Sequence, residues 1–232
     1  MPRHHAATAL LLAVAALQTL FGCSSDGDKY PDDIYTRFRY DIVTYNGLSG
    51  GSPTFTYVPR GDSSAVTLMA QSSLSTSQLA VGKRVLLRYS PEQGSAFATS
   101  GTQSIHAFFF TSIISDSLRA YRSSVPVSAY PMQPVKVRSI WRTGDYINLH
   151  GQVEYTGKPR VFMLVVDPAS AHADTVQCYL VHDMHTDTTY FWRNCYASFH
   201  VGKLWAQQSC RTLRVHVNNA ANSQENCFDF SK

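Results

Sequence analysis

The sequence predicts an all-β protein, in which an N-terminal OB-like five-stranded barrel precedes a C-terminal immunoglobulin-like β-sandwich. One observation behind this prediction is that β-branched and aromatic residues gather in runs of about five to ten, separated by Gly, Pro, Ser, Asn and Asp. A second is that no segment keeps a helical hydrophobic period over about four turns. The best helix candidate is a short one at Ser75–Leu79.

The first predicted domain covers residues 34–121. Its pattern indicates three strands, a Ser-rich connection with the candidate helical turn, and then two further strands. This order is typical of the OB-fold, a five-stranded barrel. The expected strands are Arg37–Tyr45, Thr54–Pro59, Ala65–Ala70, Arg84–Tyr89 and Ile105–Ile114.

A linker is expected at residues 122–134, because its three prolines remove backbone donors that a sheet needs. The second domain covers residues 135–232, where short strands separated by turn residues indicate a β-sandwich. The run Val161–Val166 is apolar at both parities, which predicts a central strand. The expected strands are Val135–Arg142, Tyr146–Tyr155, Val161–Asp167, Val176–His182, Tyr190–Val201, Thr212–Asn218 and Glu225–Phe230.

The N-terminus has the order of a lipoprotein signal peptide, residues 1–22. Its apolar run, Ala6–Phe21, is shorter than the roughly 20 residues that span a bilayer, so it is a targeting segment. Leu20-Phe21-Gly22-Cys23 resembles the bacterial lipobox, which implies that Cys23 carries acyl chains such as palmitate. Ordinary signal cleavage that leaves Cys23 as a free thiol is the alternative. The polar residues 23–33 predict a flexible acidic tether.

Two or more acyl chains hold a protein stably on a membrane, so we expect a lipid-anchored protein of the outer membrane. Acidic residues close behind Cys23 resemble the surface-export signal of Bacteroidetes lipoproteins, and both the periplasmic and the surface leaflet stay open. Without residues 1–22, in which Arg3 is the one charged residue besides histidines, 19 basic and 16 acidic residues remain. This near-neutral balance argues against a nucleic-acid partner.

The remaining cysteines lie in the last third of the chain. An even number in an exported protein favours two disulfides, with three possible connectivities. Hairpins centred on residues 186–187 and 218–219 would place Cys178 opposite Cys195 and Cys210 opposite Cys227. We therefore predict these two bridges, with four reduced thiols as the alternative.

The segment Val137–Asn148 carries a specific resemblance. Its Ile140-Trp141-Arg142-Thr143-Gly144-Asp145-Tyr146-Ile147-Asn148 is similar to the I-W-x-x-G-D-Y-L-N segment that opens the C-terminal domain of NigD-like lipoproteins of the Bacteroidetes. The resemblance implies the order of lipobox, OB-like domain, linker and sandwich. It also implies an envelope lipoprotein of unsettled biochemical role, named for an association with a bacteriocin gene cluster.

The densest polar cluster is His182–Asp187. His182, Asp183 and His185 are weak candidates for a divalent metal site, because imidazole and carboxylate are suitable ligands. On a strand, however, residues three apart point to opposite faces. Asp and Thr are also ordinary turn residues, so we favour a turn without metal.

Two aromatic groups are candidates for ligand stacking. Trp141, Tyr146 and Asp145 could form a sugar platform, but Trp141 shares strand parity with apolar residues, which favours packing. In the first domain, an OB-fold stacking face for carbohydrate or peptide is a second possibility. Its candidate residues, which strands also use for packing, are Tyr40, Phe55, Tyr57 and Tyr89.

No catalytic motif was found: the sequence lacks G-x-S-x-G, H-E-x-x-H, a P-loop and G-x-G-x-x-G. We therefore expect a protein that is not an enzyme, has no cofactor, and binds an unknown envelope protein or glycan. One alternative is an envelope hydrolase with an unrecognised site at His182, Asp183 and His185. Another is a fimbria-like structural subunit that adds strands to a neighbour.

Overall fold

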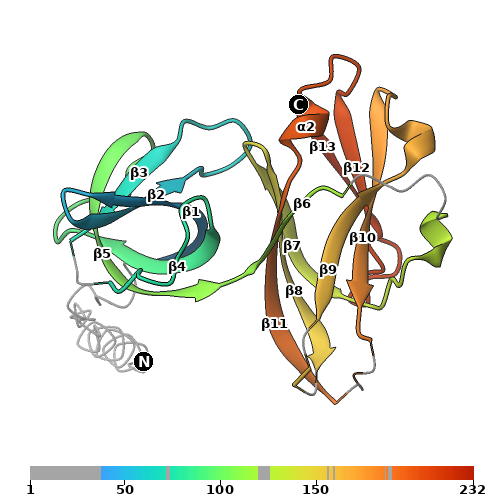
Figure 1. Cartoon of the computed structure of the whole chain (residues 1–232), viewed down its shortest axis with the longest axis horizontal. Helices are drawn as coiled ribbons and strands as arrows, with labels where there is room; N and C mark the ends of the chain where they lie inside the picture. The colour runs from blue at the N-terminus through green and yellow to red at the C-terminus, as the bar shows by residue number, and fades with distance from the viewer. Residues whose placement is uncertain are drawn as a thin grey trace, which may run out of the picture. The chain divides into compact units, whose positions relative to one another are not determined.

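The computed structural model describes residues 38–232 except 72–73, 120–125, 156, 159, 186 and 188–189. The predicted signal peptide, the acylated Cys23 and the tether lie outside the described residues. The described chain is built almost wholly of strands, which form a closed barrel and a two-layered sandwich (Figure 1). The predicted all-β fold class is confirmed.

The barrel has the strand order β1-β2-β3-β5-β4 and is closed by pairing of β4 with β1. All neighbours run antiparallel except β3 and β5, which are parallel. Where the helix at Ser75–Leu79 was expected, the chain makes a turn in which Leu79 N donates to Thr76 O at 2.9 Å. The strands are β1 (Arg39–Ser49), β2 (Ser52–Tyr57), β3 (Val66–Ala70), β4 (Arg84–Pro91) and β5 (Gly101–Ser112).

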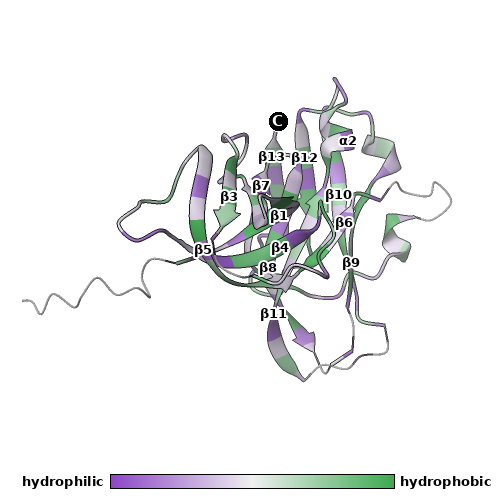
Figure 2. Ribbon diagram, turned by 60° about the vertical axis from the view of Figure 1, so that its left-hand side comes forward, coloured by the Kyte–Doolittle hydropathy of each residue, from purple (hydrophilic) through white to green (hydrophobic). Residues whose placement is uncertain are grey.

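The barrel interior is filled by alternate side chains of its strands. In the middle of β5, Ile105 and Ala107 alternate with exposed residues and face inward, and the strand carries both hydrophobic and hydrophilic positions in Figure 2. The buried interior includes Val43, Tyr45, Phe55, Leu68, Val85, Leu87, Tyr89 and Ile105.

The sandwich consists of two four-stranded sheets around a separate apolar core. One sheet has the order β13-β12-β10-β9 and the other β6-β11-β8-β7. Short helical segments are η2 (Val127–Ala129), η3 (Pro168–Ser170) and α2 (Gly202–Trp205). The strands are β6 (Ile114–Ser117), β7 (Lys136–Thr143), β8 (Tyr146–Tyr155), β9 (Val161–Val166), β10 (Thr175–Asp183), β11 (Phe191–His200), β12 (Thr212–His216) and β13 (Cys227–Ser231).

Two strands differ from the expectation. The segment Val161–Val166 was predicted to be central but forms the edge strand β9, whose side chains pack into the sandwich core. Along its outer edge, Arg119 N donates to Leu164 O at 3.0 Å. The expected strand Ile105–Ile114 divides at Ile113, and β6 pairs in parallel with β11. A strand from the range expected for the barrel domain thus completes a sheet of the sandwich.

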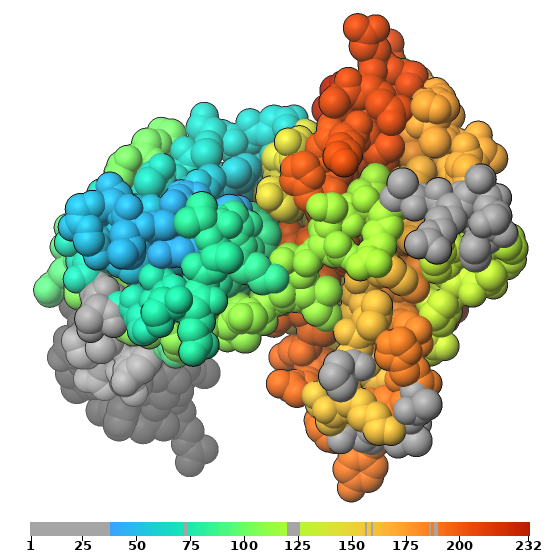
Figure 3. Space-filling view, in the orientation of Figure 1, coloured from blue at the N-terminus to red at the C-terminus, as the bar shows by residue number. Residues whose placement is uncertain are grey.

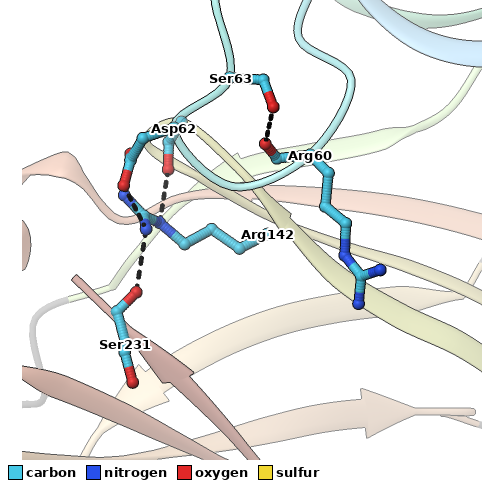
Figure 4. Close-up of polar contacts among 6 residues, drawn as sticks. Arg60, Asp62, Ser63, Arg142 and Ser231 are labelled. Atoms are coloured by element: carbon cyan, nitrogen blue, oxygen red, sulfur yellow. Dashed lines mark hydrogen bonds and ion pairs between the residues drawn. The ribbon is translucent and has the colours of Figure 1, made fainter.

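The barrel and the sandwich belong to the same compact unit, Phe38–Lys232, and direct contacts join them. The guanidinium of the buried Arg84 donates to Ser198 Oγ at 3.1 Å and to Asn148 Oδ1 at 3.0 Å. A second contact joins Arg142 to Asp62 and, at 2.9 Å, to the carbonyl of Ser231 (Figure 4). A small apolar cluster completes the junction: Ile42, Leu86, Ile113, Trp141 and Tyr196.

Candidate functional site: an aromatic patch on the barrel

The stacking face predicted from four aromatic residues does not form. Phe55 and Tyr89 are 0% and 1% exposed and belong to the barrel interior. The hydroxyl of Tyr89 donates to Asp41 Oδ2 at 2.9 Å, and this hydrogen bond holds the Tyr89 side chain inside the barrel. Only Tyr40 of the predicted set is exposed, at 48%, while Tyr57 is half-buried.

A different group of rings surrounds Tyr40. We call it the aromatic patch and define it as Phe38, Tyr40, Arg88, Phe108 and Phe109. The strand register explains how it forms, because Tyr40 on β1 lies opposite Arg88 on β4, which lies opposite Phe109 on β5. The surfaces of β1 (blue) and β4 (blue-green) lie side by side in Figure 3.

A β-bulge enlarges the patch. The register of β4 and β5 shifts between Arg88 and Tyr89, so Phe108 is an extra residue on β5 without an opposite partner. A bulge of this kind lets two consecutive side chains leave the usual alternation. Phe108 and Phe109 are accordingly both exposed, at 52% and 43%.

The cation of Arg88 lies at the centre of the patch. Its guanidinium carbon is 3.9 Å from the ring centroid of Phe38 and 5.4–5.7 Å from those of Tyr40, Phe108 and Phe109. The rings also meet edge to face, with Tyr40 and Phe109 at 6.3 Å. The Nε of Arg88 is buried and has no hydrogen-bond partner in the described structure. Cation–π attraction therefore holds the rings around the guanidinium.

The chemistry of the patch is that of a recognition surface. Contiguous exposed aromatic groups are uncommon on soluble proteins and mark interaction sites. Aromatic residues and arginine are also enriched where interfaces are buried, and they supply most of the binding energy. The patch contains no Asp, Glu or His, so it offers no acid–base pair.

A run of three phenylalanines is the sequence feature that indicates this patch, although the alternation of apolar and polar residues alone does not predict it. Phe108, Phe109 and Phe110 are consecutive, and a regular strand can direct only one parity of such a run inward. Phe110 packs against the barrel core while Phe108 and Phe109 remain outside.

Within the predicted polar cluster, His182 points into the interior, whereas Asp183 and His185 contact each other in the turn, with His185 Nδ1 3.2 Å from Asp183 Oδ2. His182 is 1% exposed, stacks on Phe162 at 4.5 Å, and its Nδ1 lies 3.2 Å from the carbonyl of Gln133. Burial lowers the pKa of His182. Asp183 instead accepts from the backbone N of His185 at 2.7 Å, in a turn where His185 has a φ of 51°. The described residues contain no group of three or more His, Cys, Asp or Glu side chains placed to hold a metal.

Trp141 is packed, as expected, but on the other face of its strand. The register of β7 and β8 shifts between Val137 and Ser139, and this bulge reverses the parity of everything after it. Ile140 therefore packs on the sandwich core, and Trp141 joins the junction with the barrel. The ring centroid of Tyr146 lies 4.2 Å from the guanidinium carbon of Arg84, so Tyr146 also packs at the junction and supports the packing role.

The register from which the two disulfides were derived is wrong. Cys178 lies on β10 and Cys195 on β11, which belong to different sheets and do not form a hairpin. Cys227 lies opposite His216, not opposite Cys210. All four are free thiols in the structure, and burial raises the pKa of Cys178 and Cys195 to about 12.

Among the described residues, no helix is long and apolar enough to cross a membrane. Residues 123–230 match the NigD-like C-terminal β-sandwich domain, and no curated protein matches the chain. The fold resembles a protein of unknown function from Bacteroides vulgatus, with a TM-score of 0.65, 15% identity, and 84% of this chain and 90% of that chain covered.

Two further solved structures share the fold. A NigD-like immunity protein from Bacteroides caccae has a TM-score of 0.60 and 20% identity, over 84% of this chain and 92% of that chain. A candidate lipoprotein from Bacteroides fragilis has a TM-score of 0.56 and 11% identity, over 84% of this chain and 96% of that chain. At these identities the likeness establishes the fold and leaves the activity open.

Proposed function

Since residues 123–230 belong to the NigD-like C-terminal β-sandwich family, we propose that the chain is a lipid-anchored envelope protein that binds a protein partner through the aromatic patch. The observation that carries this proposal is the cluster of four rings around Arg88, of which Tyr40, Phe108 and Phe109 are exposed. A structural neighbour described as an immunity protein is consistent with a role exercised by binding.

The position of the patch in the chain favours a partner that is itself associated with the membrane. Fourteen residues separate Cys23 from Phe38, which belongs to the patch. Even fully extended, such a segment spans at most about 50 Å. If Cys23 is acylated, the patch stays within that distance of the bilayer, where envelope proteins are the available protein partners.

The two alternatives have less support. A hydrolase at His182, Asp183 and His185 would need converging side chains, and the imidazole of His182 is packed away from the other two. A strand-donating subunit should have a loosely docked terminal strand. Instead β13 pairs with β12 at five consecutive positions, and Arg142 holds the carbonyl of its last residue.

Substitution of Cys23 tests the anchor. A Cys23→Ser variant should appear in the soluble periplasmic fraction, because the acyl chains are the proposed attachment. Fractionation followed by immunoblotting measures this. Retention of the variant in washed membranes would show that the anchor lies elsewhere.

A double variant tests the patch. Tagged full-length protein is cross-linked in cells and purified, and its partners are identified by mass spectrometry. Phe108→Ser with Phe109→Ser should reduce capture of the specific partner at least tenfold, since aromatic hot spots contribute about 2 kcal/mol or more each. The matched control is Leu48→Ser with Val81→Ser, whose side chains are 63% and 71% exposed outside the patch.

The supporting result is one identified envelope protein that wild type and control capture and the patch variant does not. Equal capture by all three would contradict the proposal. So would a patch variant that keeps the protein partner but loses binding to phospholipid vesicles, since the patch would then contact lipid.

A further inference from the structure

Three side chains on neighbouring strands of the β13-β12-β10 sheet form a hydrogen-bonded row. The Sγ of Cys227 lies 3.1 Å from Nδ1 of His216. The Nε2 of His216 lies 2.7 Å from Oε1 of Gln177. Cys227 is exposed, and the other two residues are half-buried. A thiol, an imidazole and an amide acceptor in this order make a nucleophile, a base and a group that orients the base.

The strand register brings the thiol and the imidazole together. Cys227 and His216 are directly opposed on β13 and β12. The next pair along the ladder is Val217 and Asn226, and it is a hydrogen-bonded pair because Val217 N donates to Asn226 O at 2.8 Å. Cys227 and His216 therefore occupy a non-hydrogen-bonded position, where opposed side chains come closest.

The imidazole is held in one orientation. Its ring stacks on Tyr179 with centroids 4.5 Å apart and planes 12° apart. Because the carbonyl oxygen of Gln177 can only accept, Nε2 of His216 carries the hydrogen and donates it. The lone pair of Nδ1 then faces the thiol, so His216 can accept the proton of Cys227.

The charges around His216 keep it available as a base. Burial and the neighbouring Arg214 lower the pKa of His216, and Asp229 opposes them. Arg214 and Asp229 pair with each other at 2.7 Å one step further along the same face. On β10 the imidazole faces the neutral Tyr179. The ring is therefore uncharged near neutral pH.

We propose that Cys227 is a reactive thiol that exchanges with disulfide compounds of the envelope, with His216 as its base and Gln177 as the positioning residue. The Sγ attacks one sulfur of the disulfide while its proton passes to Nδ1 of His216. A new Sγ–S bond forms, the old S–S bond breaks, and the leaving thiolate takes the proton from the imidazolium. Cys227 is oxidised to a mixed disulfide, and the other half of the disulfide is reduced to a thiol.

A cavity beside Cys227 has room for the second half of the disulfide. Its volume is about 470 Å³, and its wall includes Cys227, Trp141 and Phe230. Arg60 and Arg142 also line it, with Arg142 fixed by Asp62 and Ser231 as Figure 4 shows. The wall also includes Asp229, which is paired with Arg214. Since Arg142 is paired with Asp62, Arg60 is the guanidinium that suits a disulfide carrying a carboxylate.

The mixed disulfide should persist once formed. Cys178 and Cys210 are buried in the sandwich core, and Cys195 packs against that core. Among the described cysteines, none is therefore exposed enough to resolve a disulfide at Cys227. The product is a stable covalent adduct, not a turnover intermediate.

The test uses the reduced full-length protein in detergent and dithiobis(nitrobenzoate), a dianionic disulfide. The released thiol gives the rate, and peptide mapping gives the labelled residue. A thiol of ordinary pKa is only about 3% thiolate at pH 7, so an efficient base can accelerate it by up to about thirtyfold. We expect Cys227 to be labelled first, and His216→Ala to slow labelling at pH 7 about tenfold.

Two further variants separate chemistry from folding. Gln177→Ala should slow labelling several-fold, because the imidazole loses its orientation. His172→Ala, at an exposed histidine away from the row, is the matched control and should leave the rate unchanged. The wild-type rate should fall only when the pH drops below the pKa of His216, which burial and Arg214 lower, whereas the His216→Ala rate should rise steadily with pH because no base takes the thiol proton. Equal rates and pH profiles for wild type and His216→Ala would overturn the proposal, as would first labelling at another cysteine.

Discussion

Arg84 tests how the barrel and the sandwich are held together. Its guanidinium donates to Asn148, Ser198 and Thr44 at 3.0–3.1 Å. Among the described ion pairs, none gives Arg84 a carboxylate partner. The perturbation is Arg84→Met, which keeps an unbranched side chain but removes the charge and its three hydrogen bonds.

The magnitude follows from two opposing contributions. Hydrogen bonds to a charged group stabilise by about 1.5–3 kcal/mol each, so three contribute about 4.5–9 kcal/mol. Against this, burial lowers the pKa of Arg84 from 12.5 to about 10. That change corresponds to about 3 kcal/mol against the charged form. The difference centres on about 3 kcal/mol, which we expect Arg84→Met to remove from the free energy of unfolding. Arg84→Ala should remove about 1 kcal/mol more.

Urea unfolding followed by two probes measures the effect. All three tryptophans, Trp141, Trp192 and Trp205, lie on the sandwich chain, and Trp141 also packs at the junction, so their fluorescence reports the sandwich and its junction, while far-ultraviolet circular dichroism reports both domains. We expect the two curves to coincide for wild type and to separate for Arg84→Met. Arg211→Met, at a side chain 78% exposed, is the control and should change stability by less than about 0.5 kcal/mol.

Replacing a buried charge by an apolar side chain is stabilising in some proteins, because the cost of desolvation exceeds the gain. If Arg84→Met unfolds at the same urea concentration as wild type or a higher one, the hydrogen bonds do not offset that cost. The junction would then depend on the apolar cluster alone.

Three further changes have defined outcomes. Asp187→Ala removes the partner of the buried Arg160, 2.9 Å away, and should cost about 3–5 kcal/mol in urea unfolding. The pKa of His182 is lowered from 6.5 by burial, so the unfolded chain binds more protons just below pH 6.5. Stability should be full above pH 6.5 and fall as the pH drops below it, and His182→Gln should weaken this dependence in urea titrations. Gly151→Ala would bring a Cβ to 2.9 Å from Val135 Cγ1. This crowding should lower the free energy of unfolding by about 1–3 kcal/mol, measured as a lower melting temperature.

The sequence was sufficient to locate the strands, because alternation and turn residues are local properties. Arg84–Pro91 and Tyr146–Tyr155 begin at the residues expected for them. Pairing was harder, because it depends on which sheet a strand joins. The segments of Cys178 and Cys195 are consecutive strands, which suggested a hairpin, but the chain crosses between sheets there.

Bulges explain why the candidate site could not be predicted. Each bulge reverses the parity of all later residues in a strand, and parity was the basis for assigning faces. This is why Trp141 faces the junction and why Phe108 reaches the surface. Burial of Phe55 and Tyr89 depends on barrel closure, which no local pattern encodes.

The position of β6 also limits how such a gene can be recombined. A crossover in the proline-bearing segment 122–134 would separate β6 from the sandwich it completes. The stretch Ala197–His200 of β11 would then have to pair with the β6 of another relative, and a poor fit would expose backbone groups, which recruit foreign strands and promote aggregation. Viable exchange of the barrel between relatives should therefore place its junction before Ile114, so that the sandwich inherits its edge strand with the rest of its sequence.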